Sequence, residues 1–228
     1  MIRPLRNLAW WAADYAYAAG WQVRAFANRT DPAGFHSGER VPILVIPGVY
    51  ESWKFLQPLV VALHDRGHPV HVVDPLRHNR QPVAAGAALV TEYLERHGLS
   101  DVVLVAHSKG GLIGKHVMAL GPAAHRVRGM VAVAAPFGGS RYAPLMVTPT
   151  LRSLSPRDAT ILALARETGV NARIVSVYGR FDPHIPGGSE LAGAQNVVIE
   201  TGGHFRILAH PRVIAEVAAM AELPPAPG

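Results

Sequence analysis

The sequence contains no cysteine and is poor in charged residues. Without a thiol the chain forms no disulfide, no thiolate zinc site and no cysteine-ligated iron–sulfur cluster, and a cysteine nucleophile is excluded. Charged residues make up 17% of the 228 positions, against 49% for hydrophobic residues. Because disorder requires the opposite balance, this composition indicates one folded domain with a substantial core.

Basic residues form no cluster, although they give the chain a net charge of +6. Only Lys54, Lys109 and Lys115 are lysines, and the arginines are scattered along the sequence. Nucleic-acid-binding proteins usually gather basic side chains on one face, with stacking aromatic residues between them. We therefore expect no nucleic-acid partner, and the charge indicates an arginine-rich surface.

Patterns for metals and nucleotide cofactors are missing as well. His68 and His71 are three residues apart in a predicted strand, so their side chains would face opposite ways. No predicted helix carries a His-x-x-x-His pair, and no glycine-rich phosphate loop precedes a helix. We expect neither a metal ion nor a cofactor.

No stretch reaches the roughly 18 apolar residues of a membrane span, but the N-terminal segment is unusual. Arg3 and Arg6 precede a mostly apolar run in which Ala16-Tyr17-Ala18 resembles a cleavage site for a secretion signal. Asp14 interrupts that run, and tryptophans and tyrosines crowd it. We predict a helix over residues 4–28 that packs on the domain, with a helix at a lipid interface and a signal peptide as alternatives. The expected location is the cytoplasm, with membrane association and secretion left open.

Predicted strands alternate with predicted helices through most of the chain. Short apolar runs predict six strands, over residues 42–47, 70–73, 101–106, 129–134, 173–178 and 196–200. Helices are predicted over residues 52–66, 83–97, 109–120, 156–168 and 212–220. The alternation predicts an α/β fold with a mainly parallel sheet of about six strands and helices on both faces.

The chain is predicted to have three parts. Residues 1–40 form the aromatic-rich helix and a loop, residues 41–223 the α/β domain, and residues 224–228 a flexible tail. Residues 141–169 break the alternation of strands and helices. In a parallel sheet such an excursion leaves from the carboxyl edge, where sites form, so we expect a small lid or cap there.

The clearest chemical signal is Val105-Ala-His-Ser-Lys-Gly-Gly111, where a predicted strand runs directly into Ser108 and a helix follows. A nucleophilic serine on such a bend needs small residues two positions before and after it, because strand and helix crowd there. Ala106 and Gly110 meet that need, although alanine replaces the usual first glycine. The bend exposes the serine oxygen and aims the Lys109 amide at it as an oxyanion donor. In the alternative reading, Ser108 only caps the helix.

Together with Ala135-Pro-Phe-Gly-Gly-Ser140, this segment resembles bacterial lipases and esterases of the α/β-hydrolase superfamily. The resemblance covers roughly residues 41–220. It implies the α/β-hydrolase fold and a serine nucleophile with a histidine base and an acidic partner. Only about 40 residues precede the first strong strand, so the antiparallel pair that often opens this fold is expected to be absent.

The chain order of the superfamily, serine then acid then histidine, completes the predicted triad. Asp182 follows the fifth predicted strand in a Gly-x-x-Asp loop, and His204 follows the sixth in a Gly-Gly-His loop. His204 would take the serine proton and Asp182 would orient the imidazole. Glu200 and Asp74 are weaker candidates for the acid.

The resemblance also implies a second oxyanion donor in Ile46-Pro-Gly-Val-Tyr50. The amide of Val49 occupies that place, with Tyr50 as the alternative, and Pro47 replaces the histidine that lipases usually carry. Tyr50, Phe137 and Ile185 are expected to wall an acyl pocket.

These residues predict a cofactor-independent serine hydrolase, a lipase or esterase that acts on small-molecule or lipid esters of carboxylic acids. The alternatives are a thioesterase or acyltransferase of the same fold, and a non-catalytic binding protein that keeps the fold.

Overall fold

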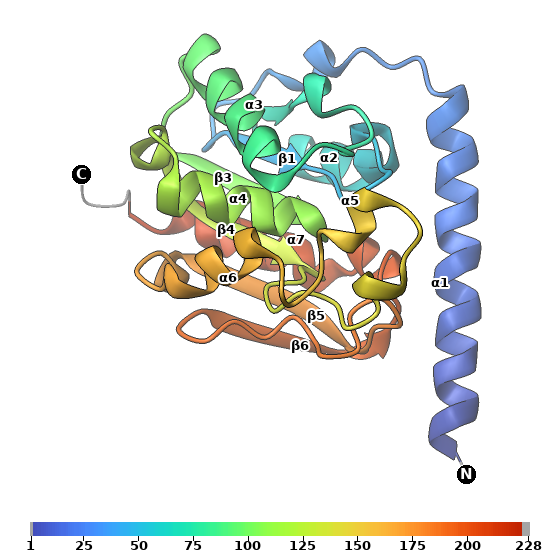
Figure 1. The fold of residues 1–228 in the computed structure, drawn as a ribbon. Helices are drawn as coiled ribbons and strands as arrows, with labels where there is room; N and C mark the ends of the chain where they lie inside the picture. Colours follow the sequence, from blue (N-terminus) through green and yellow to red (C-terminus); the bar gives the residue numbers. More distant parts are fainter. Residues whose placement is uncertain (1, 225–228) are drawn as a thin grey trace.

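The computed structural model describes residues 2–224 and contains the predicted parallel sheet (Figure 1). The strands lie side by side in the order β2-β1-β3-β4-β5-β6, and every neighbouring pair is parallel. They are β1 (Ile43–Ile46), β2 (Val70–Val72), β3 (Val102–His107), β4 (Val127–Val133), β5 (Ile174–Phe181) and β6 (Gln195–Gly202). The predicted tail lies, after Pro224, outside the described residues.

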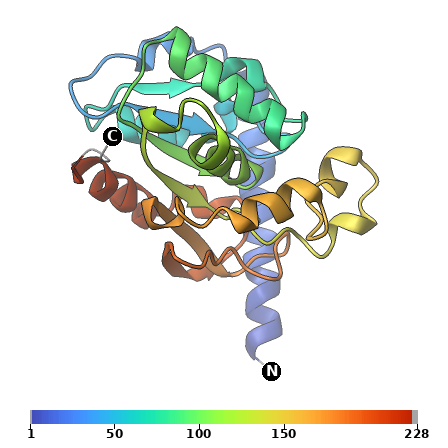
Figure 2. The ribbon, with the colours of Figure 1, turned by 60° about the vertical axis from the view of Figure 1, so that its left-hand side comes forward.

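Helices cover both faces of the sheet, as the buried strands require (Figures 1 and 2). One face carries α3 (Val83–Arg96), α4 (Lys109–Leu120) and α6 (Ala159–Arg166), and the other carries α2 (Gln57–His64) and α7 (Pro211–Glu222). Because strand side chains alternate, Leu104 packs into the first layer and Val103 and Val105 into the second. Both faces of the sheet are therefore buried, and a site can open only at an edge of the sheet.

The order of the strands determines where a site can form. β1 lies between β2 and β3, and the chain after β1 enters α2 on one face while the chain after β3 enters α4 on the other. Loops that diverge in this way leave a crevice at the carboxyl edge of the sheet.

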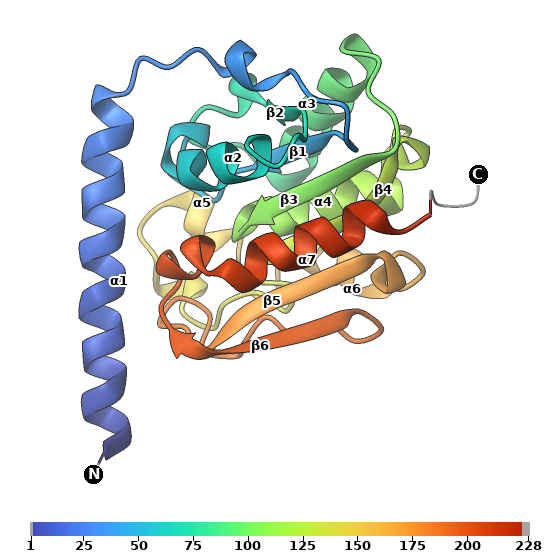
Figure 3. The ribbon, with the colours of Figure 1, turned by 180° about the vertical axis from the view of Figure 1, so that it is seen from behind.

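The N-terminal helix α1 (Ile2–Ala27) runs across this carboxyl edge (Figures 1 and 3). It contacts β6 and two short 3-10 helices, η2 (Trp53–Leu56) and η7 (Arg206–Ala209), while its first turns extend beyond the domain. Within residues 2–224 no helix, α1 included, has the length and apolar character needed to cross a membrane.

Residues 141–169 leave the sheet as expected and form an irregular excursion (Figure 2, yellow to orange). It contains α5 (Pro149–Arg152) and α6, and α6 is shorter than the helix predicted over residues 156–168. The reason is its cap, because the side chain of Asp158 accepts a hydrogen bond from the amide of Thr160 at 2.9 Å.

Candidate active site

Ser108 occupies the sharp bend between β3 and α4, with φ 51° and ψ −124°. A Cβ atom at Gly110 would lie 2.5 Å from the carbonyl oxygen of Ile46, and one at Gly111 would lie 2.4 Å from Cβ of Ala135. Only glycine tolerates such close approaches, so the small residues after the serine allow the bend to form. The left-handed backbone of Ser108 is a strained conformation of the kind that holds functional side chains.

The structure brings together the three residues predicted as a triad. The hydroxyl of Ser108 donates to Nε2 of His204 at 2.9 Å, and Nδ1 of His204 donates to Oδ2 of Asp182 at 2.7 Å. The other oxygen of Asp182 accepts the amides of His184 at 2.7 Å and Ile185 at 3.0 Å. All three triad side chains are buried, so the geometry provides a nucleophile, a base and an orienting acid in one chain of hydrogen bonds.

The two weaker candidates for the acid lie elsewhere. Glu200 forms an exposed ion pair with Arg180, and Asp74 is exposed after β2. Neither is within the hydrogen-bond chain of His204.

The attraction between Asp182 and His204 shifts the pKa values of both side chains toward their charged forms. Burial by itself would raise the pKa of Asp182, but His204 and the two backbone amides hold this pKa below its ordinary value. Burial would lower the pKa of His204, but Asp182, with smaller effects of Glu51 and Asp14, holds it above 6.5. The site therefore favours an ionised Asp182 and stabilises the imidazolium that forms when His204 takes a proton.

Two backbone amides beside the nucleophile are free to bind an oxyanion. The N–H groups of Val49 and Lys109 have no hydrogen-bond partner among the described residues, and Val49 lines the same cavity as Ser108. The amide of Tyr50, the alternative donor, binds the carbonyl oxygen of His78 at 2.7 Å. Val49 is therefore the donor that the loop after β1 leaves available.

Glu51 is a buried site residue that the sequence did not indicate. Its Oε2 accepts the amide of Gly48 and Nδ1 of His107, both at 2.8 Å. Nε2 of His107 in turn donates to the carbonyl oxygen of His204 at 3.0 Å. Glu51 and His107 thus connect the loop that carries Val49 to the loop that carries His204.

Asp14 is the second unforeseen residue, and it comes from α1. Its side chain is fully buried, and its two oxygens accept the amides of His204 at 2.8 Å, Phe205 at 2.9 Å and Arg206 at 2.8 Å. The glycines before His204 permit this approach, because a Cβ at Gly203 would lie 2.4 Å from Oδ1 of Asp14. The residue that interrupts the apolar N-terminal run therefore binds the loop of the base.

Replacing Asp14 with alanine is expected to destabilise the fold and slow catalysis together. Three amides would lose their acceptor, which costs about 3 kcal/mol or more in the free energy of unfolding. A displaced His204 should lower kcat by about 10- to 100-fold at temperatures where the variant stays folded. Chemical denaturation and ester hydrolysis measure the two effects.

Asp31→Ala is the matched control, because Asp31 also accepts a backbone amide, that of Ala33 at 2.9 Å, but on the exposed surface. It should lower the stability by about 1 kcal/mol and leave kcat unchanged. If folded Asp14→Ala kept full activity, the contact would serve stability alone.

A cavity of about 480 Å³ lies over Ser108 and is lined mostly by apolar side chains. Tyr50 and Ile185 line it as predicted, but Phe137 does not. Phe137 is buried in the core on the face of the sheet that carries α3, α4 and α6, and Pro136 lines the cavity in its place. The position of Phe137 after a predicted strand did not show that its ring would be buried in the core.

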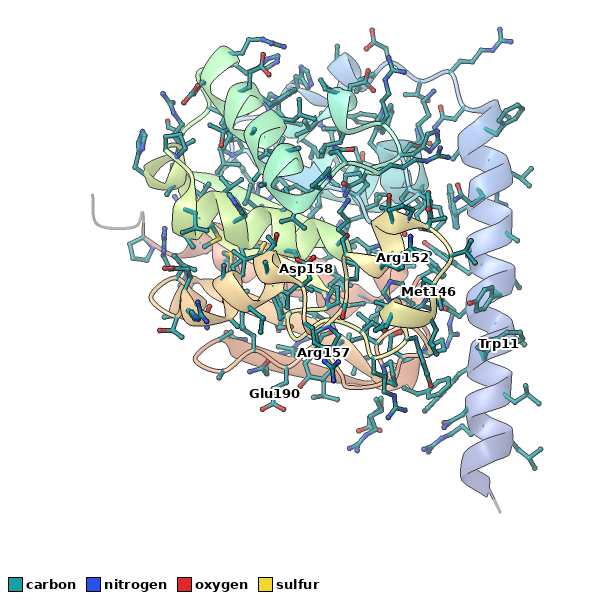
Figure 4. The ribbon with its side chains drawn as sticks, in the orientation of Figure 1. Trp11, Met146, Arg152, Arg157, Asp158 and Glu190 are labelled. Atoms are coloured by element: carbon teal, nitrogen blue, oxygen red, sulfur yellow. The ribbon has the colours of Figure 1, made fainter. Side chains whose placement is uncertain are left out.

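The remaining walls come from the excursion, which the sequence placed at this edge of the sheet, and from α1, which the sequence did not connect to the pocket. The excursion contributes Met146, and α1 contributes Trp11 and Tyr15. Figure 4 places Met146 on the part of the excursion next to α1, and Trp11 on the helix itself. The hydroxyl of Tyr15 lies 3.0 Å from Nε2 of His184, whose pKa burial lowers to about 4, so that this ring is neutral at pH 7.

Groups of three or more His, Asp or Glu side chains arranged to hold a metal ion do not occur in the described part of the chain.

The sequence matches no family model and no curated protein. Solved structures do match. The mature form of the Bacillus licheniformis lipase BlEst2 superposes with a TM-score of 0.65 at 16% identity, over 86% of this chain and 95% of the lipase. The putative non-heme bromoperoxidase BpoC from Mycobacterium tuberculosis gives a TM-score of 0.61 at 15% identity, over 82% and 94%.

A structure from work on the metagenome-derived lipolytic enzymes LipS and LipT gives a TM-score of 0.57 at 16% identity, over 82% of this chain and 96% of that one. At such identities the likeness concerns the fold. The order of the parallel strands and the serine bend at the edge of the sheet agree with it. The chain has the α/β-hydrolase fold, and its structure resembles those of bacterial lipases and esterases.

Proposed function

We propose that the protein is a serine hydrolase that cleaves carboxylic esters, in the manner of an esterase or lipase. The observation that carries the proposal is the buried hydrogen-bond chain from Ser108 through His204 to Asp182, at 2.9 and 2.7 Å. Ser108 would serve only as a helix cap in the alternative reading, but its side chain makes no capping hydrogen bond with α4.

The proposed reaction follows from the two hydrogen bonds of His204, which allow Nε2 to take and return a proton. Oγ of Ser108 attacks the ester carbonyl while Nε2 of His204 takes the hydroxyl proton, and the amides of Val49 and Lys109 donate to the oxyanion. His204 then gives this proton to the leaving alcohol, which leaves an acyl group on Ser108. Water attacks the acyl carbonyl with His204 again as base, so that the carboxylic acid departs and Ser108 regains its proton.

The cavity supports an apolar acyl group as substrate. Its volume, about 480 Å³, lies in the range of small-molecule sites, roughly 300 to 1,000 Å³. Met146, Leu151, Leu154 and Ile185 line it, beside Ser108. A thioesterase or acyltransferase would use the same residues, so rates on matched oxygen esters and thioesters, with and without an acceptor alcohol, separate these reactions.

A fluorophosphonate probe tests the proposal, because the activated serine displaces fluoride and keeps the phosphonate. We expect one label per chain, on the peptide that contains Ser108, and no label on Ser108→Ala. Ser153→Ala should label like the native protein, because its hydroxyl only donates to the carbonyl oxygen of Thr150 at 2.8 Å. A folded native protein that takes no label would be a non-catalytic binding protein.

A further inference from the structure

The side of α1 that faces away from the domain is apolar along its length. Leu5, Leu8, Val23 and Phe26 expose 70, 61, 70 and 95% of their surface. Helical spacing puts alanines 12, 16 and 19 on the same side. A helix on the outside of a protein normally shows polar residues there, so this side lacks the partner that its composition requires.

The apolar side of α1 continues into the mouth of the cavity. Trp11 and Tyr15, both about two-fifths exposed, belong to the helix and also line the cavity. On the excursion, Leu145 and Val147 expose 79 and 90% of their surface, on either side of Met146. Figure 4 shows Met146 on the portion of the excursion beside α1. Exposed apolar side chains therefore flank the entrance to the site from two segments.

The exposed charged side chains described on α1 are positive. Asp14 is its only acidic residue and is buried against backbone amides. Arg6 and Arg24 are exposed, each stacked over a tryptophan ring, at 4.6 and 4.8 Å, and neither forms an ion pair within residues 2–224. An apolar helix face bordered by unpaired arginines, with aromatic rings at its edge, is suited to an anionic lipid surface.

We propose that the apolar side of α1, with Leu145 and Val147 of the excursion, docks the protein on a membrane that contains anionic phospholipids, with the cavity mouth toward the lipid. A second copy of the chain fits this side less well, because α1–α1 contact would bring arginines together without an exposed acid on the helix. A lipid surface also accounts for the place of the cavity entrance within the same patch. The docking itself does not require the proposed hydrolysis, but it would give the site its ester from the membrane.

Sedimentation with vesicles tests the docking. Ser108→Ala is used so that no lipid is hydrolysed, with vesicles of phosphatidylcholine alone or with an equal part of phosphatidylglycerol. We expect binding to the mixed vesicles, and a partition coefficient at least about tenfold lower for Leu8→Glu/Phe26→Glu in the same background. Arg6→Gln and Arg24→Gln should each weaken binding to the mixed vesicles by about fivefold, and should matter little with phosphatidylcholine alone.

Leu120→Glu/Leu162→Glu is the matched control, since these leucines are 49 and 46% exposed on α4 and α6 and the pair adds the same charge. It should bind vesicles like its parent. With Ser108 intact, both pairs should hydrolyse a short water-soluble ester at the native rate, because none of the four residues lines the cavity.

The proposal is overturned if the parent protein stays in the supernatant, or if Leu8→Glu/Phe26→Glu sediments as well as the control pair. A native dimer that Leu8→Glu/Phe26→Glu dissociates, as seen by light scattering, would also overturn it, because a second copy would then cover the helix. Vesicle binding by a protein without esterase activity would support the docking and overturn only the proposed function.

Discussion

Alanine at Ser108, at His204 or at both is expected to lower kcat for ester hydrolysis by about the same factor, roughly 10⁶. The two side chains form one unit, joined by the 2.9 Å hydrogen bond from the serine hydroxyl to Nε2. Without His204 the serine keeps its proton, and without Ser108 the base has no nucleophile to activate. The second substitution therefore removes nothing that the first has left in place. Initial rates on a short-chain ester, measured for the two single variants and the double variant, test this.

The residual rate of the double variant should still exceed that of the reaction in water, because the amides of Val49 and Lys109 and the cavity remain. His210→Ala is the matched control. His210 lies six residues after His204, and its Nδ1 only caps α7 by accepting the amide of Arg212 at 3.2 Å. It should keep kcat near the native value. A double variant far slower than either single variant would mean that Ser108 and His204 act independently, contrary to the proposed mechanism.

The fold could be predicted because its signals are local. Each buried strand is an apolar run, and the bend at Ser108 depends on small residues within two positions of the serine. β6 was predicted over residues 196–200 but extends from Gln195 to Gly202. β6 is an edge strand of the sheet, and the residues that the prediction missed, Gln195, Thr201 and Gly202, are polar or glycine. An apolar run marks only the stretch of such a strand that packs on the core.

Glu51 and Asp14 could not be predicted because their partners are distant in sequence. Asp14 is 190 residues from His204, and Glu51 is 56 residues from His107. A single carboxylate in an apolar helix indicates that something must satisfy it, but the sequence does not show what. The same applies to the pocket, whose α1 wall depends on a contact that no pattern in residues 1–28 encodes. The proximity of Ser108, Asp182 and His204 could be predicted because they follow β3, β5 and β6, whose carboxyl ends lie at one edge of the parallel sheet.

Asp182→Asn is expected to lower kcat by about 10⁴-fold at neutral pH while the site keeps its shape. The carbonyl oxygen of the asparagine can still accept the amides of His184 and Ile185, as Oδ1 of Asp182 does at 2.7 and 3.0 Å. Its NH₂ group then faces Nδ1 of His204, which must become an acceptor. The imidazole proton moves to Nε2, which faces Ser108, so that His204 can no longer take the serine proton. Steady-state kinetics and the retained affinity for a substrate analogue separate this loss from unfolding.

The pH profile gives a second readout of the same substitution. His204 must be neutral to act as base, so kcat/KM should fall as the pH falls through its pKa, which the attraction of Asp182 holds above 6.5 in the native site. With Asp182→Asn that charge is gone, while burial of His204 still disfavours the imidazolium, so the midpoint of the acid limb should move to lower pH. Asp158→Asn, at the cap of α6, should change neither kcat nor the midpoint, since Asp158 touches only the amide of Thr160 there. A midpoint that stays in place in Asp182→Asn would mean that another group sets the pKa of the base.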